Sequence, residues 1–261
     1  MRGLFALSLV LFLAAPFVPL MLWSVARGWF FPDVLPQMWH LEAWSRIASP
    51  SSGVPQAVWT TTWVAALTTG LSLVVGLPAA LALGRGFRGA RAVELLLLAP
   101  VILPGIAVVF GLHGLFLRLG LANTTGGVVL AHLIPTLPYM VLVLAGVGRN
   151  LDPDLTAQAR SLGASAPRAF LLVTLPALAP GLMVGALFAF LVSWSQYILT
   201  LVIGGGKVVT LPLLLFATAS AGRNDLTAAM ALVYVAPGLV IVALVARQVT
   251  GRSAALAGPR P

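Results

Sequence analysis

Residues 151–181 read LDPDLTAQARSLGASAPRAFLLVTLPALAPG, and they interrupt a chain that is otherwise almost continuously apolar. Of the 261 residues, 60% are hydrophobic and 8% are charged, whereas soluble domains have about 45–50% and about 25%. The chain is therefore predicted to be an all-α integral membrane protein. The quoted segment must then be a loop between spans, and it carries folding signals of its own.

The loop predicts two short helices joined by a turn. Asp152 is a suitable N-cap, Pro153 suits the first helical position, and Gly163 suits the left-handed residue that ends a helix. After the turn, Ser165 can cap a second helix, which Pro176 is expected to end or to kink into the next span. The expected structure is a helix-turn-helix between the fourth and fifth spans.

The first of these helices would carry a thin apolar ridge. Leu155, Ala159 and Leu162 are spaced by four and three residues and so share one helix face. Such a ridge suits a helix that lies on lipid headgroups, and it equally suits docking into a groove of another protein. The residues alone leave both interpretations open.

Charge-free stretches mark six spans, because a helix needs about 20 apolar residues to cross a hydrocarbon layer. They lie near 4–26, 60–83, 95–117, 127–147, 178–200 and 226–246. A further apolar stretch, 208–222, is too short to cross and is expected to be interfacial or re-entrant. The first span could be read as a signal peptide, but its apolar run is longer than the usual h-region, which favours an uncleaved helix.

The distribution of basic residues predicts that both termini are cytoplasmic, since Lys and Arg are retained on that side. Ten of the 15 basic residues fall in the segments that are then internal, and five fall in the external ones. They are dispersed among the loops, so the net charge of +9 indicates topology and not a nucleic-acid partner. We expect residues 1–56 to form the first helix and a periplasmic loop, 57–250 the core with spans two to six, and 251–261 a cytoplasmic tail.

The segment 151–181 resembles the cytoplasmic EAA motif of permease subunits of binding-protein-dependent type I ABC importers. Gly163 matches the glycine of the motif, Ala159 its second alanine, and Leu175-Pro176 its closing pair. Ala157 stands where the motif has glutamate, and Gln158 where it has the first alanine. The stretches LLLLAPVILPGIAVVFGL (95–112) and LAHLIPTLPYMVLV (130–143) resemble the third and fourth spans of the same superfamily. TLPLLLFATASAGRNDLTAAMALV (210–233) resembles the branch that handles polyamines, thiamine and ferric iron.

The resemblance implies a multi-pass permease of the cell inner membrane that moves a small polar solute into the cytoplasm. Its partners would be an ABC ATPase dimer docked on the 148–177 loop, a second permease subunit, a periplasmic or lipid-anchored solute-binding protein, and membrane lipid. ATP and Mg would bind the ATPase, and this chain would hold no cofactor. The residues expected to couple to the ATPase are Leu155, Ala157, Gln158, Ala159, Arg160, Leu162 and Gly163.

The chain lacks the phosphate-binding loop that ATP hydrolysis requires. Its single lysine, Lys207, lies in GGGKVV (204–209) and is followed by valine, where such a loop has Ser or Thr. The energy for transport is therefore expected to come from a partner chain, and this chain is not expected to be an enzyme.

Polar residues inside the spans suggest a route for the solute, because they are costly in lipid. At helical spacing Ser193, Gln196, Tyr197 and Thr200 form one face of the fifth span, as a pathway lining would require. His132 and Tyr139 lie in the fourth span. The alternative is that these hydroxyl and amide groups bond between helices and that His132 is structural. His132 and His113, without cysteines or nearby carboxylates, are not expected to bind metal.

Two other functions remain to be compared with import. A secondary transporter needs ionisable groups within its spans for ion coupling. No Asp, Glu, Lys or Arg lies within the six predicted spans, apart from boundary residues such as Glu94. A membrane-embedded enzyme needs a nucleophile-base pair or a metal cluster, and the spacing of residues suggests neither.

Overall fold

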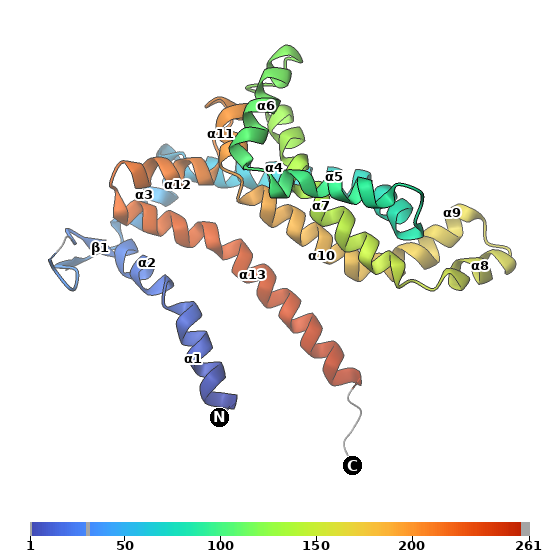
Figure 1. Cartoon of the computed structure of the whole chain (residues 1–261). Helices are drawn as coiled ribbons and strands as arrows, with labels where there is room; N and C mark the ends of the chain where they lie inside the picture. Colours follow the sequence, from blue (N-terminus) through green and yellow to red (C-terminus); the bar gives the residue numbers. More distant parts are fainter. Residues whose placement is uncertain (1, 30–31, 257–261) are drawn as a thin grey trace. The chain divides into compact units, whose positions relative to one another are not determined.

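The structure is a computed structural model that describes residues 2–29 and 32–256, and most of these residues are helical (Figure 1). The chain divides into two compact units, one made of residues up to Trp59 and from Thr210 on, the other of Thr60–Val209.

The helices are α1 (Arg2–Ala14), α2 (Phe17–Ser24), α3 (Glu42–Ala48), the 3₁₀ helix η1 (Pro50–Ser52), α4 (Val54–Arg85), α5 (Ala90–Ile102), α6 (Gly105–Arg118), α7 (Thr125–Arg149), α8 (Pro153–Ser161), α9 (Ala166–Ala169), the π-helix η2 (Phe170–Thr174), α10 (Leu175–Trp194), α11 (Ile198–Gly204), α12 (Leu211–Ser220) and α13 (Asn224–Leu256). Two short strands, β1 (Ala26–Arg27) and β2 (Met38–Trp39), pair antiparallel with Ala26 opposite Trp39.

In the first unit, α13 packs against α2, α3 and α12. The segment between α2 and α3 is tied to α3 by charge: Glu42 forms an ion pair with Arg46 one turn later, and its Oε2 lies 3.6 Å from Nη1 of Arg27. The hydrogen bond from the Arg46 guanidinium holds the pKa of the Glu42 carboxyl below its ordinary value. This unit contains the predicted outer loop with its tryptophans, of which Trp29 lies against Trp23 with ring centroids 4.8 Å apart.

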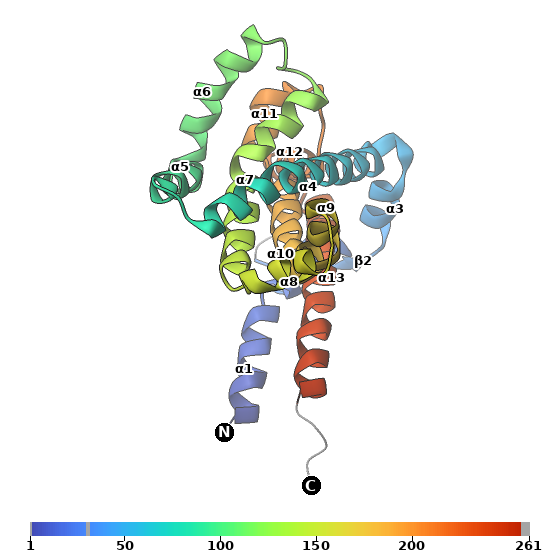
Figure 2. The same cartoon turned by 90° about the vertical axis from the view of Figure 1, so that its right-hand side faces the viewer.

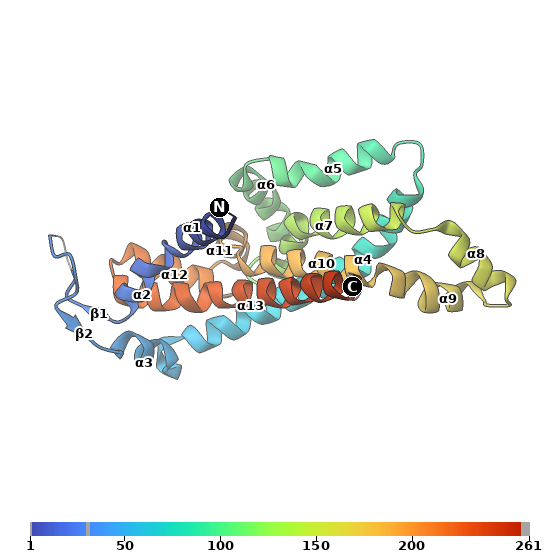
Figure 3. The same ribbon diagram turned by 90° about the horizontal axis from the view of Figure 1, so that it is seen from below.

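The second unit is built around α7, which lies along α10 and also contacts α5 and α11 (Figures 1 and 3). Close approach of these helices depends on glycine on either side of the buried Met140. A Cβ added at Gly185 of α10 would lie 2.8 Å from the sulfur of Met140, and one added at Gly76 of α4 would lie 2.7 Å from its Cγ. Small residues at such contacts let helices pack by van der Waals forces where lipid removes the usual hydrophobic drive.

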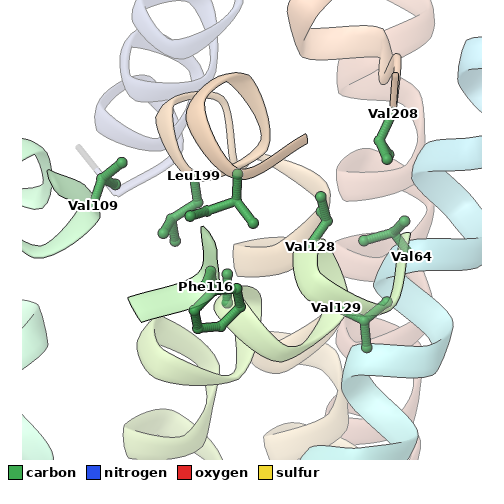
Figure 4. Packing of buried hydrophobic residues seen from close by; sticks show 9 residues of the cluster. Val64, Val109, Phe116, Val128, Val129, Leu199 and Val208 are labelled. Atoms are coloured by element: carbon green, nitrogen blue, oxygen red, sulfur yellow. The ribbon is translucent and has the colours of Figure 1, made fainter. Parts of the chain in front are cut away.

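A second packed cluster lies where α4, α6, α7 and α11 meet (Figure 4). Its buried members are all apolar: Val64, Val109, Phe116, Val128, Val129, Ala131, Leu199, Ile203 and Val208. Beside it, the N–H of Asn123, a residue with a positive φ of 63°, donates to the Ile203 carbonyl at 2.7 Å. The loop before α7 is thereby fastened to α11.

Three helices of the described residues are long and apolar enough to cross a membrane: Val54–Arg85, Thr125–Arg149 and Ala166–Trp194. Two bent pairs raise the number to as many as five: Leu7–Ala14 with Phe17–Ser24, at 44°, and Ala90–Ile102 with Gly105–Arg118, at 102°. The stretch 208–222, predicted to be too short to span, contains the ten-residue α12. The predicted sixth span lies within α13, whose side chains are described only as far as Val240.

The first and third predicted spans each coincide with a bent pair of helices. The first is interrupted before Phe17 by Pro16, and the third is broken at Leu103 and Pro104, where α6 begins in a new direction. Proline removes a backbone donor and disfavours a helical conformation for the residue before it, and the extended backbone of Leu103 (ψ 146°) fits that effect.

Candidate functional site

The helix α8 begins and ends where the sequence predicts. The Asp152 side chain accepts a hydrogen bond from the Asp154 N–H at 2.9 Å, and Pro153 occupies the first turn. At the other end Gly163 has φ +90°, its N–H donates to the Arg160 carbonyl at 3.0 Å, and the Ala164 N–H donates to the Ala159 carbonyl at 3.0 Å. This pair of bonds is a Schellman motif, which satisfies the last carbonyls of the helix and needs a left-handed residue.

The second helix of the loop is continuous with the fifth predicted span. Ser165 stands at the N-cap of α9 without a side-chain hydrogen bond. Pro176 was expected to end this helix or to kink it into the next span, and it does not end it, because Ala166–Trp194 is one helical stretch. The five residues before α10, Phe170–Thr174, form a π-helical turn. A π-turn shifts the pattern of backbone hydrogen bonds in the helix. This shift accommodates Pro176, which has no backbone N–H to donate.

Figures 1 and 3 show α8 beyond the ends of α7 and α10, and in Figure 2, which looks from the right-hand side of Figure 1, this helix lies toward the viewer. Leu162 is 90% exposed and Leu155 is 44% exposed, while Ala159 is half-buried. A shallow hollow on the helix is lined by Asp154, Ala157, Gln158, Ser161 and Leu162. Thr156 points the other way and its hydroxyl lies 3.3 Å from that of Thr174, which joins α8 to the π-turn. The helix is thus held at its base and presents apolar side chains outward.

Three of the six residues predicted to line a pathway form one buried polar cluster. The Nδ1 atom of His132 lies 2.9 Å from the Ser193 hydroxyl, and its Nε2 atom lies 2.9 Å from the Thr200 hydroxyl. All three side chains are buried. His132 is bonded to hydroxyls on two other helices. These are the hydrogen bonds between helices that the sequence analysis gave as the alternative to contact with the solute.

The expectation that Ser193, Gln196, Tyr197 and Thr200 share one continuous helix face is wrong. The helix α10 ends at Trp194, and α11 begins at Ile198. The Ser195 hydroxyl donates to the Val192 carbonyl at 3.1 Å, and such local bonds compete with the helical ladder. Gln196 and Tyr197 lie in the break and are partly exposed, as is Tyr139, whose ring stacks on Phe188 at a centroid distance of 6.1 Å.

The sequence interpretation missed a second row of buried hydroxyls. The Thr136 hydroxyl donates to the His132 carbonyl at 2.9 Å and accepts from the Ser72 hydroxyl of α4, which lies 3.0 Å away. Thr68, one turn before Ser72, donates to the Val129 carbonyl at 3.5 Å. The available signal was the four-residue spacing of Thr68 with Ser72 and of His132 with Thr136, which places each pair on one helix face.

The remaining candidates lie apart from this cluster. Glu94, at the boundary of the predicted third span, forms an ion pair with Arg149 at the end of α7. His113 lies on α6 and is half-buried. Within residues 2–29 and 32–256, no group of three His, Asp or Glu side chains is placed to hold a metal ion.

Comparison with known proteins gives concordant matches. Residues 72–252 match the family described as the binding-protein-dependent transport system inner membrane component. The chain is 34% identical over 225 residues to the molybdenum transport system permease protein ModB of Mycobacterium bovis, which covers 80% of this chain and 84% of that protein. It is 30% identical to the putrescine transport system permease protein PotI of Escherichia coli, and the match covers 68% of this chain and 66% of that protein. A chain from a bacterial ABC transporter involved in alginate import has the same fold, with a TM-score of 0.71, 16% identity and 94% of each chain covered.

Proposed function

Because this chain belongs to the family of inner-membrane components of binding-protein-dependent transport systems and is a permease of the type I ABC importer class, we propose that α8 is the element on which a partner ATPase docks. The observation that carries this proposal is the exposure of the helix. Leu155 and Leu162 remain uncovered in a helix that is capped at both ends and fastened at its base. A rigid helix with outward apolar side chains suits insertion into a groove.

The helix is also built to transmit force. The loop continues through α9 and the π-turn into α10 as one helical stretch, so that movement of a docked partner would be passed to a spanning helix. Leu155 and Leu162 would enter the partner's groove, Ala157 and Gln158 would line its edge, and Gly163 would set the direction of α9. ATP and Mg would be bound by the partner.

We propose six spans with both termini in the cytoplasm. The bent pairs α1 with α2 and α5 with α6 would each cross once, and α4, α7, α10 and α13 would cross as single helices. The ends of α4 and α7, with Arg85 and Arg149, would then face the cytoplasm together with α8, as expected from the retention of basic residues on that side. A second permease subunit and a solute-binding protein would complete the importer.

The transported solute is proposed to be small and polar. The sequence favours a polyamine, thiamine or iron, and the relatives named for molybdenum and putrescine add an oxyanion to the candidates. Gln196, Tyr197 and Tyr139, which are partly exposed, are proposed to face the pathway, whereas His132, Ser193 and Thr200 are buried.

The test is uptake into proteoliposomes that contain the complex purified with its ATPase and binding protein. Labelled molybdate, putrescine and thiamine would be supplied outside, with ATP inside or with a proton or sodium gradient alone. We expect uptake of one of these solutes to require ATP and the isolated chain to show no ATP hydrolysis. Uptake driven by a gradient without ATP would instead support a secondary transporter.

A further inference from the structure

The break between α10 and α11 is held together by a residue from another helix. Ser195, Gln196 and Tyr197 separate the two helices, and no proline lies among them. Both helices pack against α7. On α7, His132 makes a polar contact with a side chain on each side of the break.

The two ring nitrogens of His132 bond to opposite sides of the break. Nδ1 lies 2.9 Å from the hydroxyl of Ser193, one residue before α10 ends, and Nε2 lies 2.9 Å from the hydroxyl of Thr200, in the first turn of α11. In a neutral imidazole one nitrogen donates and the other accepts. One side chain can therefore join both helix ends without leaving a ring nitrogen unsatisfied.

The proton positions follow from a third bond. The Thr200 hydroxyl lies 3.2 Å from the Gln196 carbonyl and donates to it, so its single proton is committed within the break. Thr200 must then accept from Nε2–H of His132, and Nδ1 accepts from the Ser193 hydroxyl. The chain of bonds runs from α10 through the imidazole to α11 and closes on the backbone of Gln196.

The second row of hydroxyls bonds to the backbone of His132 and not to its imidazole. Thr136 donates to the backbone carbonyl of His132 at 2.9 Å, and its hydroxyl lies 3.0 Å from that of Ser72 on α4. These side chains are buried. Thr136 lies one turn after His132 on α7, but among the described residues it forms no hydrogen bond with α10 or α11. Thr136 is therefore a matched comparison for His132.

We infer that His132 is a positioning residue that fixes the break so that Gln196 and Tyr197 are presented to the passing solute, an inference that rests on the proposed importer function. Buried hydroxyls that lose a partner are left unsatisfied, so removal of the imidazole releases both helix ends. The side chains between them then lose a defined position. His132 acts through the break and does not contact the solute.

The test uses the absence of cysteine from the chain. Single cysteines replace Gln196 or Tyr197 in the assembled complex in liposomes, and the rate of reaction with a charged aqueous thiosulfonate reagent is measured. We expect His132→Val to raise the rate at both positions by about five- to thirtyfold, the factor given by the loss of one or two hydrogen bonds. Thr136→Val should leave both rates within about twofold. His132→Gln, which keeps a donor and an acceptor, should restore a rate near that of the parent.

The outcomes separate this inference from the importer function. Equal effects of His132→Val and Thr136→Val, or no effect of either, would overturn the positioning role while ATP-driven uptake stands. Failure of both cysteines to react in resting and nucleotide-bound states would overturn the presentation of these residues, and co-purification of the ATPase would still report the importer function. If His132→Val lowers the amount of assembled complex, Ser193→Ala removes one of the two bonds to the imidazole and is expected to raise the rates by a smaller factor. Thr200→Val removes the other bond to the imidazole together with the bond to the Gln196 carbonyl, and it is expected to raise the rates as well.

Discussion

Substitution of Gly163 by valine tests whether the shape of the 148–177 loop matters for docking of the ATPase. Gly163 has φ +90°, and no atom lies within 4 Å of a Cβ built there. The substitution therefore costs backbone energy alone, about 1–2 kcal/mol for a left-handed residue with a side chain. Since about 1.4 kcal/mol is a factor of ten in an equilibrium, the loop geometry that ends α8 should lose about five- to thirtyfold in population.

The chain offers a matched control at Gly120, which has φ +67° and likewise no atom within 4 Å of a built Cβ. Its N–H donates to the Leu117 carbonyl and the Leu121 N–H donates to the Phe116 carbonyl, so it ends α6 by the same motif. Gly120 lies in the predicted outer loop. Gly120→Val should therefore carry a similar backbone cost without altering the proposed docking surface.

The assay is co-purification of the ATPase with the membrane-inserted chain, together with uptake by the complex. We expect Gly163→Val to insert at near-normal amounts while it loses ATPase association, and Gly120→Val to keep association. Normal association and uptake in Gly163→Val would refute the reasoning, because the loop would then tolerate a changed exit from α8. Equal loss in both variants would show that the effect is one of general stability.

Further substitutions probe the docking surface, the packing of α7 and the charges near α3. Ala159→Arg should weaken ATPase pull-down, whereas Ala157→Glu, at an exposed position, should leave folding unchanged and alter only the affinity of the pull-down. Gly185→Val should lower the free energy of unfolding by about 1–3 kcal/mol through overpacking, because its Cβ would lie 2.8 Å from Met140 Sδ. The control Gly146→Ala, with no atom within 4 Å, should raise it by about 0.4–1 kcal/mol. The lowered pKa of Glu42 means that its contribution to stability is complete above the ordinary carboxyl pKa and is lost as pH falls through the lowered value. Glu42→Gln should therefore reduce the fall of the melting temperature as the pH is lowered through the acidic range. An unchanged dependence on pH would show that the ion pair of Glu42 with Arg46 contributes nothing to stability.

The loop 151–181 was predictable because its signals are local. An N-cap, a proline in the first turn and a glycine after the last turn act through backbone bonds between residues a few positions apart. Asp152, Pro153 and Gly163 occupy the predicted places in the structure. The apolar composition similarly identifies a membrane protein without any knowledge of contacts, because lipid is the solvent for most of its surface.

The polar cluster and the helix breaks depended on tertiary contacts. A periodic pattern assumes that a helix continues, and at Ser195–Tyr197 it does not. Hydroxyls on both sides of the break bond to an imidazole more than 60 positions away in the sequence. The residues next to His132 in the sequence do not determine whether its ring contacts solute, lipid or protein. Only the packing of α7 against α10 and α11 decided that it would be buried between two hydroxyls, since hydrogen bonds between helices depend on which faces meet in space.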